Sequence, residues 1–164
     1  MSNLCSHSAL ASCTLPSSEQ VADFLDQAEI LCDRRNLRFT QLRKQVLELV
    51  CRAEQPVGAY QLLDELRQSG RSAAPPTVYR ALDFLLEQGL IHRLATNNTY
   101  LACAHPQHAH AAVFLVCGGC GHTQEVHTED VIAELEQRAE QFDFTIAHAS
   151  VEITGLCHRC RDPE

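Results

Sequence analysis

The stretch VCGGCGH at residues 116–122, with its counterpart LCHRC at residues 156–160, decides how this chain folds. Each stretch holds a C-x2-C pair: Cys117 with Cys120, and Cys157 with Cys160. Two thiolates at this spacing can bind one tetrahedral zinc ion, and two such pairs complete a closed four-cysteine site of the structural kind. The two pairs therefore predict a structural zinc.

The distance between the two pairs indicates what the metal would hold. They lie 40 residues apart, which is wider than a compact zinc ribbon and leaves room for a strand, a helix and another strand. A lone C-x2-C is equally compatible with a disulfide, a redox pair or buried thiols, but two pairs that flank one segment favour zinc. The metal is thus expected to join the ends of a small α/β domain.

The compartment expected for the chain agrees with bound metal. Residues 1–15 lack the basic start and apolar centre of a secretory signal, and no apolar run approaches the roughly 18 residues of a membrane span. We therefore expect a cytoplasmic protein with no membrane association. In that reducing compartment, nine cysteines favour metal binding over disulfides.

Charge is distributed unevenly along the 164 residues. The formal net charge is -8, yet residues 17–98 carry 10 basic and 11 acidic residues, whereas residues 99–164 carry 3 and 10. The first part includes five cations close together in sequence, namely Arg34, Arg35, Arg38, Arg43 and Lys44. A basic face on the first part of the chain therefore remains compatible with nucleic-acid binding, although net charge alone does not favour it.

The first part of the chain predicts a winged helix-turn-helix. Its expected elements are a helix capped by Ser17, a helix capped by Thr40, a short helix around residues 60–66, a helix from Pro75 to Gly89, and a hairpin of residues 90–95 and 99–102. In that arrangement the last helix enters the DNA major groove. The outward face of that helix would include Thr77, Tyr79, Arg80 and Asp83. The Arg80 side chain suits a contact to guanine and the Tyr79 ring a contact to a thymine methyl group. The alternative is an ordinary solvated surface.

After residue 103 the pattern changes to a small α/β unit, so the fold class is α+β. Residues 111–116 and 124–127 predict a hairpin, residues 129–142 a helix with Val131, Ile132, Leu135, Ala139 and Phe142 facing inward, and residues 144–153 a final strand. The domain boundaries follow: a disordered segment 1–16, a DNA-binding domain 17–102, a hinge 103–111, and a dimerisation and metal-binding domain 112–164.

A second group of possible ligands crowds the hinge: His92, Cys103, His105, His108, His110, His122 and Glu125. One thiolate, two imidazoles and one carboxylate from this group would suit tetrahedral zinc. Any one of these histidines taken alone is more often an ordinary surface residue, but their density favours a metal site. If His92 joins ligands from the hinge and from the second domain, bound metal would fix the angle between the domains.

These motifs together resemble the ferric uptake regulator superfamily, and within it the zinc uptake regulator branch. The resemblance runs from about residue 20 to the C-terminus and rests on PPTVYRALDFLLEQG at residues 75–89, the histidine-rich hinge and both cysteine pairs. It implies a structural four-cysteine zinc, a homodimer formed through the C-terminal domain, and a hinge metal that activates DNA binding. It also implies a second, regulatory zinc in each subunit and DNA contacts by Tyr60 and Arg80.

The resemblance further implies which residues hold the regulatory zinc. By position they are His92, Cys103, His110 and Glu125, with the choice among His105, His108 and His110 left open. Some relatives have a third site, for which His148 would qualify. Ala111 and Val113 occupy positions where iron-sensing members carry ligands, and no role is assigned to Cys5, His7 and Cys13.

The function expected is that of a zinc-responsive repressor whose homodimer binds inverted-repeat operators in double-stranded DNA, with no small-molecule substrate. The nearest alternative is an iron- or peroxide-sensing regulator of the same fold. A more distant alternative is a zinc enzyme such as a nucleobase deaminase, since residues 127–129 match its H-x-E motif. That motif also requires a proline before the cysteine pair, and both pairs here lack it. A zinc-buffering protein would leave the helix at residues 75–89 unexplained.

Overall fold

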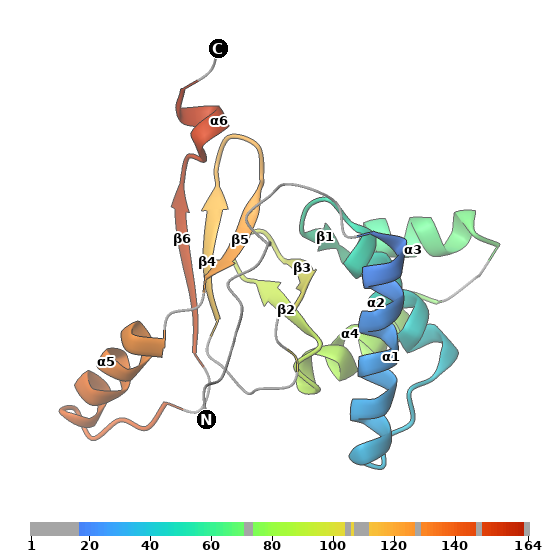
Figure 1. The fold of residues 1–164 in the computed structure, drawn as a ribbon, viewed down its shortest axis with the longest axis horizontal. Helices are drawn as coiled ribbons and strands as arrows, with labels where there is room; N and C mark the ends of the chain where they lie inside the picture. The colour runs from blue at the N-terminus through green and yellow to red at the C-terminus, as the bar shows by residue number, and fades with distance from the viewer. Residues whose placement is uncertain are drawn as a thin grey trace.

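The computed structural model describes residues 17–70, 74–103, 106, 112–126, 129–146 and 149–162. Figure 1 shows the four N-terminal helices gathered at one side, and a narrow sheet with the two C-terminal helices at the other. The elements are α1 (Ser18–Arg34), α2 (Gln41–Arg52), β1 (Val57–Gly58), α3 (Ala59–Gln68), α4 (Pro75–Glu87), β2 (Ile91–Leu94), β3 (Thr99–Ala102), β4 (Ala112–Cys117), β5 (Thr123–Val126), α5 (Glu129–Glu140), β6 (Ser150–Gly155) and α6 (His158–Arg161). We refer to α1 through Cys103 as the N-terminal half and to β4 through α6 as the C-terminal half.

The ends of the N-terminal helices lie where the sequence places them. Ser17 Oγ accepts a hydrogen bond from the Gln20 N–H at 3.2 Å, and Gln20 Oε1 accepts one from the Ser17 N–H at 2.8 Å, which completes a capping box. Thr40 caps α2, and Pro75 occupies the first turn of α4. Gly89 has a φ of 69°, a conformation that glycine adopts without strain, and it follows the end of α4.

One apolar core holds the N-terminal half together. It runs from Val21 on α1 through Leu47 on α2 and Leu82 on α4 to Tyr100 on β3. The strands form an antiparallel sheet in the order β1-β3-β2, so the hairpin β2–β3 follows α4 directly. This order of helices and hairpin is that of a winged helix-turn-helix, with α1 as an additional N-terminal helix.

The C-terminal half is a three-stranded sheet in the order β5-β4-β6, in which β4 pairs with β5 antiparallel and with β6 parallel. Parallel strands need a crossover, and the segment that contains α5 supplies it. In Figure 1, α5 lies apart from both the sheet and the N-terminal helices. Among the described residues, no helix is long and apolar enough to cross a membrane.

Two predictions for this half are wrong. The final strand begins at Ser150 rather than near Phe144, because Asp143 leaves α5 with a φ of 53° and residues 144–146 only lead the chain back toward the sheet. The apolar residues that were expected to face inward are largely exposed: Val131 and Leu135 on α5, and Phe142, which is 81% exposed in the turn after α5. The reason is that α5 lies apart from the sheet and from the N-terminal helices, so these elements do not cover its apolar face. The expected disorder of residues 1–16 falls outside the described residues.

Candidate metal centres and nucleic-acid-binding face

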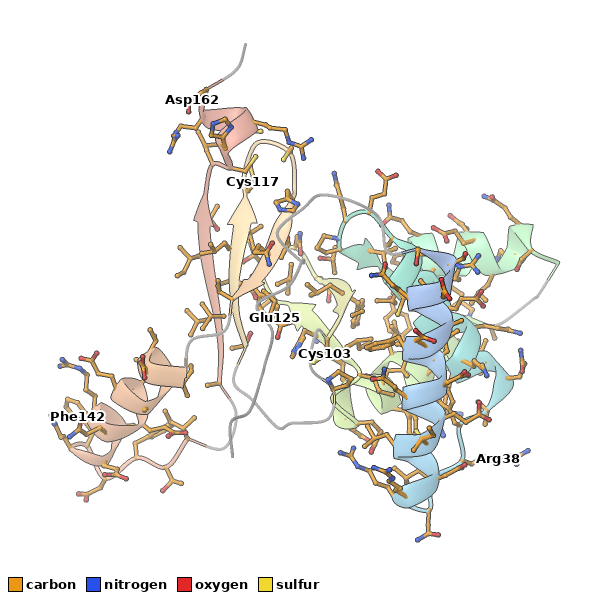
Figure 2. The ribbon with its side chains drawn as sticks, in the orientation of Figure 1. Arg38, Cys103, Cys117, Glu125, Phe142 and Asp162 are labelled. Carbon is orange, nitrogen blue, oxygen red and sulfur yellow. The ribbon has the colours of Figure 1, made fainter. Side chains whose placement is uncertain are left out.

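The parallel pairing of β4 and β6 brings the two cysteine pairs together. Cys117, the last residue of β4, lies opposite Gly155, the last residue of β6, so both pairs meet at one end of the sheet. The four sulfur atoms of Cys117, Cys120, Cys157 and Cys160, the four-cysteine cluster, lie within 4.8 Å of one another. Figure 2 shows Cys117 at this end of the sheet, next to α6.

Close packing around the sulfur atoms explains one glycine of the VCGGCGH stretch. A Cβ atom added to Gly119 would lie 3.0 Å from the Cys160 Sγ atom and 3.1 Å from its Cβ atom. Because Cys160 is held on α6, a side chain at position 119 would displace it by a few tenths of an ångström. Gly119 therefore allows the two cysteine pairs to approach each other.

The electrostatics of the four-cysteine cluster fit a bound cation. The Cys157 N–H donates to Cys117 Sγ at 3.3 Å, and this bond, with others from nearby backbone N–H groups, lowers the pKa of Cys117 to about 6. The pKa of Cys160 is raised to about 12 by the neighbouring Cys120, Cys157 and Cys117 sulfur atoms. Four thiolates at this spacing coexist only beside a positive charge, and four sulfur ligands are those that structural zinc prefers.

A second group of ligand atoms lies between the two halves. Ligand atoms of His92 on β2, Cys103 after β3 and Glu125 on β5, the junction cluster, lie within 4.8 Å of one another. His92 Nε2 and Glu125 Oε1 are 3.5 Å apart, and Cys103 is only 2% exposed. Figure 2 shows Cys103 and Glu125 where the hairpin β2–β3 meets the C-terminal sheet. A thiol, an imidazole and a carboxyl group in this arrangement supply three ligands for a tetrahedral zinc.

Backbone and ring contacts hold the junction cluster in place. The Cys103 N–H donates to the Leu90 carbonyl at 3.0 Å, which fixes the chain just beyond β3. The His92 ring packs edge-on against Phe114 of β4, with 5.2 Å between ring centroids. These contacts hold the Cys103 and His92 side chains beside Glu125 of the C-terminal half.

The remaining ligand candidates divide into two sets. His122 lies in the turn after the first cysteine pair, and its carbonyl accepts a hydrogen bond from the Cys117 N–H at 2.8 Å, so it belongs to the surroundings of the four-cysteine cluster. The other candidates lie outside the described residues: the predicted fourth ligand His110, its rivals His105 and His108, the third-site candidate His148, the H-x-E histidine His127, and Cys5, His7 and Cys13.

The candidate DNA-contacting residues lie on α3 and α4. Tyr60 on α3 is 74% exposed, and Thr77 and Arg80 are exposed on α4. Tyr79 is half-buried and packs against the apolar core, so only part of its ring faces solvent. Three of the four candidates thus lie on the surface of the helix-turn-helix.

The expected basic face is partly used within the fold. Arg35 donates to the Gln88 carbonyl and side chain at 3.1 and 2.9 Å, Arg43 lies 3.5 Å above the Phe84 ring, and Lys44 pairs with Glu29 at 2.9 Å. These cations join α1 and α2 to each other and to α4. On α3, Asp64 and Arg67 pair with each other at 3.3 Å, the local pairing that their spacing favours.

The sequence did not predict two contacts between the halves. Glu152 on β6 accepts hydrogen bonds from the backbone N–H groups of Ala95 and Thr96 in the turn after β2. Gln55 donates through Nε2 to the Cys120 carbonyl at 2.9 Å. Both join residues more than fifty positions apart, and a glutamate or glutamine in a linear pattern carries no signal of such a partner.

The sequence matches the Ferric uptake regulator family over residues 34–154. The chain belongs to this family. It is 40% identical, over 143 residues, to the zinc uptake regulation protein of Escherichia coli (strain K12), an alignment that covers 87% of this chain and 84% of that relative.

Solved structures of family members resemble the present one. A zinc uptake regulator complexed with zinc and DNA has a TM-score of 0.82 at 39% identity, with 86% of this chain and 95% of that chain covered. Holo XcZur has a TM-score of 0.79 at 41% identity, covering 85% of this chain and 97% of its own. Apo XcZur, at 40% identity and covering 88% and 99%, has a TM-score of only 0.51. At nearly equal identity, this chain is therefore arranged more like the holo structure than the apo structure.

Proposed function

We propose that this protein is a zinc-responsive transcriptional regulator: its zinc-loaded homodimer binds inverted-repeat operators and represses genes for zinc uptake. The observation that carries the proposal is the junction cluster, because its ligands come from both halves of the chain. A metal bound there couples the position of α4 to that of the C-terminal sheet. The 40% identity to a zinc uptake regulation protein supports the same function.

The proposal assigns a role to each part of the chain. Residues 17–102 bind DNA, residues 103–111 form the hinge, and residues 112–164 bind metal and dimerise. Each subunit holds two zinc ions. The structural one is bound by Cys117, Cys120, Cys157 and Cys160, and the regulatory one by His92, Cys103, His110 and Glu125. DNA is contacted by Tyr60, Thr77, Tyr79 and Arg80.

Cys103 favours zinc over iron at the junction. Its thiol is buried beside His92 and Glu125, so a metal bound there would have a thiolate among its ligands. Thiolate is a soft ligand that suits zinc, whereas carboxylates and other oxygen ligands suit harder cations. Sensing of iron or peroxide by this site remains the second candidate, and the experiment below separates the two.

The open apolar surface of the C-terminal half supports a homodimer. Leu115 and Ile153 lie opposite each other on the face of the sheet that points away from the N-terminal half, and both are exposed. Val131 and Leu135 on α5, and Phe142 in the turn after it, add further exposed apolar side chains. Exposed apolar area of this kind marks an interface, and a twofold axis through it would present two α4 helices to successive major grooves about 34–36 Å apart.

The proposed switch is a shift between arrangements of the two halves. A near-complete switch needs about 5.5 kcal/mol of differential zinc affinity between them. The difference in TM-score between holo and apo XcZur supports this view, because sequence identity is nearly the same in both comparisons. Four thiolates on the structural zinc would leave no coordination position for a reacting water, so the proposed function includes no catalysis. We also propose a cytoplasmic location.

A DNA mobility shift across buffered free Zn(II) and Fe(II) tests the proposal. The wild-type dimer, with its structural zinc retained, is expected to bind an inverted-repeat, AT-rich library at trace zinc and to ignore iron. Cys103→Ser is expected to leave a folded dimer with weak zinc-dependent binding, and Cys13→Ser, outside every proposed ligand set, serves as the matched control. Full zinc-dependent operator affinity in Cys103→Ser would show that Cys103 is not a ligand of the regulatory zinc. DNA binding that depends on Fe(II) would show that iron, not zinc, is the signal.

A further inference from the structure

One face of the C-terminal sheet carries two carboxylates in a row with a phenylalanine between them. Phe114 of β4 lies directly opposite Glu125 of β5 on one side and Glu152 of β6 on the other. Residues directly opposite each other on neighbouring strands point to the same face of a sheet. Glu125, Phe114 and Glu152 therefore all point toward the hairpin β2–β3.

The hairpin covers this face closely. Phe114 is fully buried, and together with Val116 it forms an apolar cluster with Leu94 of β2, against which Leu101 of β3 packs. This cluster joins the two halves through apolar contacts. It sets the hairpin at a fixed distance from the sheet, between the two carboxylates.

The two carboxylates meet opposite ends of the same strand. Glu125 lies 3.5 Å from His92 near the start of β2, within the junction cluster. Glu152 lies at the other end: it accepts from the Ala95 N–H at 2.6 Å, from the Thr96 N–H at 3.2 Å, and from the Thr96 hydroxyl group. His92 and Ala95 are three positions apart, about 10 Å along an extended chain.

The chemistry of the Glu152 contact is that of a carboxylate held by charge-assisted hydrogen bonds. Partial burial raises the pKa of Glu152, but the bonds from the Thr96 side chain and from the Ala95 and Thr96 N–H groups outweigh burial, so that its pKa lies below the ordinary value. The carboxylate is therefore ionised when the halves are in contact. A neutral side chain of the same shape would be a weaker acceptor for three donors.

A metal at the junction cluster fixes one point of the hairpin and leaves rotation about that point. A second attachment about 10 Å away removes this freedom. We propose that Glu152 is a positioning residue that binds the turn after β2 and, together with the junction metal, holds the two halves in the DNA-binding arrangement. This inference rests on the proposed function and specifies how the metal-dependent arrangement is maintained.

Thermodynamic linkage gives the expected behaviour. If the Glu152 contact stabilises the arrangement that binds zinc at the junction, loss of the contact lowers the apparent zinc affinity. By the same linkage, zinc binding stabilises the contact by an equal free energy. Saturating zinc then restores the arrangement, and with it the DNA affinity. A residue that only stabilised the fold would instead lower DNA binding at every zinc concentration.

The test compares Glu152→Gln with Glu136→Gln, which removes the same charge from an exposed position on α5. Glutamine keeps the shape of the side chain but offers one acceptor oxygen where the carboxylate offers two. Glu152→Gln is expected to raise the free-zinc midpoint of DNA binding on the order of tenfold, within the 5- to 150-fold range of typical coupling. Structural zinc, melting temperature and DNA affinity at saturating zinc should match those of Glu136→Gln.

Amide hydrogen exchange supplies a readout that needs no DNA. In the zinc-loaded wild-type dimer the Ala95 and Thr96 N–H groups should be protected, and in Glu152→Gln they should exchange faster while the amides of α2 remain unchanged. Thr96→Val removes one donor from the other side of the contact, and in a double-mutant cycle its effect on the zinc midpoint should be less than additive with that of Glu152→Gln.

The outcomes separate this inference from the proposed function. Absence of zinc-dependent DNA binding in the wild type would overturn the proposed function. Zinc-dependent binding in the wild type, with Glu152→Gln indistinguishable from Glu136→Gln in both the zinc midpoint and amide exchange, would overturn the role of Glu152 alone. Strict additivity in the cycle would likewise show that Glu152 and Thr96 do not act on the switch through their contact.

Discussion

The N-terminal half buries a continuous apolar core, whereas the C-terminal half leaves most of its large apolar side chains open. Leu47, Leu62 and Leu82 are fully buried between the N-terminal helices. Among the described residues beyond Cys103, those buried are Val113, Phe114, Val116 and Cys117. Phe114 and Val116 cluster with Leu94 of the N-terminal half, so much of this small core belongs to the junction.

The contrast shows how one short chain uses two sources of stability. Apolar burial suffices for the packing of the N-terminal helices and hairpin, because it scales with the area removed from water. A sheet of three strands with one open face removes less area by itself, so in the proposed function the structural zinc and a second copy of the chain stabilise this half further. We therefore expect metal dependence to be concentrated in the C-terminal half and at its contact with the N-terminal half.

The largest effect is expected from Cys117→Ser. Structural zinc contributes on the order of 10 to 16 kcal/mol of apparent binding energy, and three remaining thiolates cannot retain it fully. The amides of β4 and β6 should lose protection while those of α2 and α4 keep it, as measured by hydrogen exchange and zinc content. Cooperative loss of both halves at once would contradict the division between them.

The converse change is Leu62→Ala. Leu62 is fully buried on α3, and truncation of a buried leucine costs about 2 to 5 kcal/mol because it removes apolar contacts and leaves a cavity. Denaturant unfolding should show destabilisation of the N-terminal half, with the structural zinc retained. Release of that zinc under native conditions would mean that the two halves do not fold as separately stabilised units.

The open face of the sheet is tested by Ile153→Asp. Ile153 is 50% exposed, so a charge there costs little within one subunit but is unfavourable in a dimer interface. The free energy of dimerisation, measured by sedimentation, should become less favourable by at least about 2 kcal/mol. Thr154→Asp, at the neighbouring position whose side chain points to the other face of β6, serves as the comparison, and equal effects would place the interface elsewhere.

The smallest effect concerns the N-terminal half alone. Arg80 is exposed on α4, and loss of a bidentate contact to guanine costs about 1 to 3 kcal/mol. Arg80→Ala should lower operator affinity at saturating zinc and leave the zinc midpoint of the surviving binding unchanged. A shifted zinc midpoint with normal affinity would assign Arg80 to the switch instead of to DNA.

Local patterns predicted the N-terminal half well and the C-terminal half less well, for physical reasons. The Ser17 and Thr40 caps and the Gly89 stop depend on neighbouring residues, and the structure confirms them. The inward face predicted for residues 129–142 was wrong because α5 lies apart from the sheet that was expected to cover it. The spacing of the cysteines predicted their cluster, because C-x2-C geometry is local and the crossover only has to bring its ends together.

Contacts across the junction mark the limit of prediction from a single sequence. The junction cluster joins residues from β2, from the end of β3 and from β5; the density of candidate ligands and the resemblance to the family indicated it, whereas no local spacing did. Glu152 meets the turn after β2 through the register of β6 on β4, which no run of neighbouring residues encodes. Both arise from the way the hairpin lies on the sheet.

The central claim, that a second zinc binds between the halves through Cys103, is tested most directly by X-ray absorption at the zinc edge. Protein with one zinc per subunit should show only sulfur neighbours, at about 2.3 Å. With the second equivalent bound, the added zinc should show one sulfur neighbour and nitrogen or oxygen neighbours at about 2.0 to 2.2 Å, and Cys103→Ser should lose that single sulfur. A second zinc with no sulfur neighbour in the wild type, or no second zinc at all, would contradict the claim.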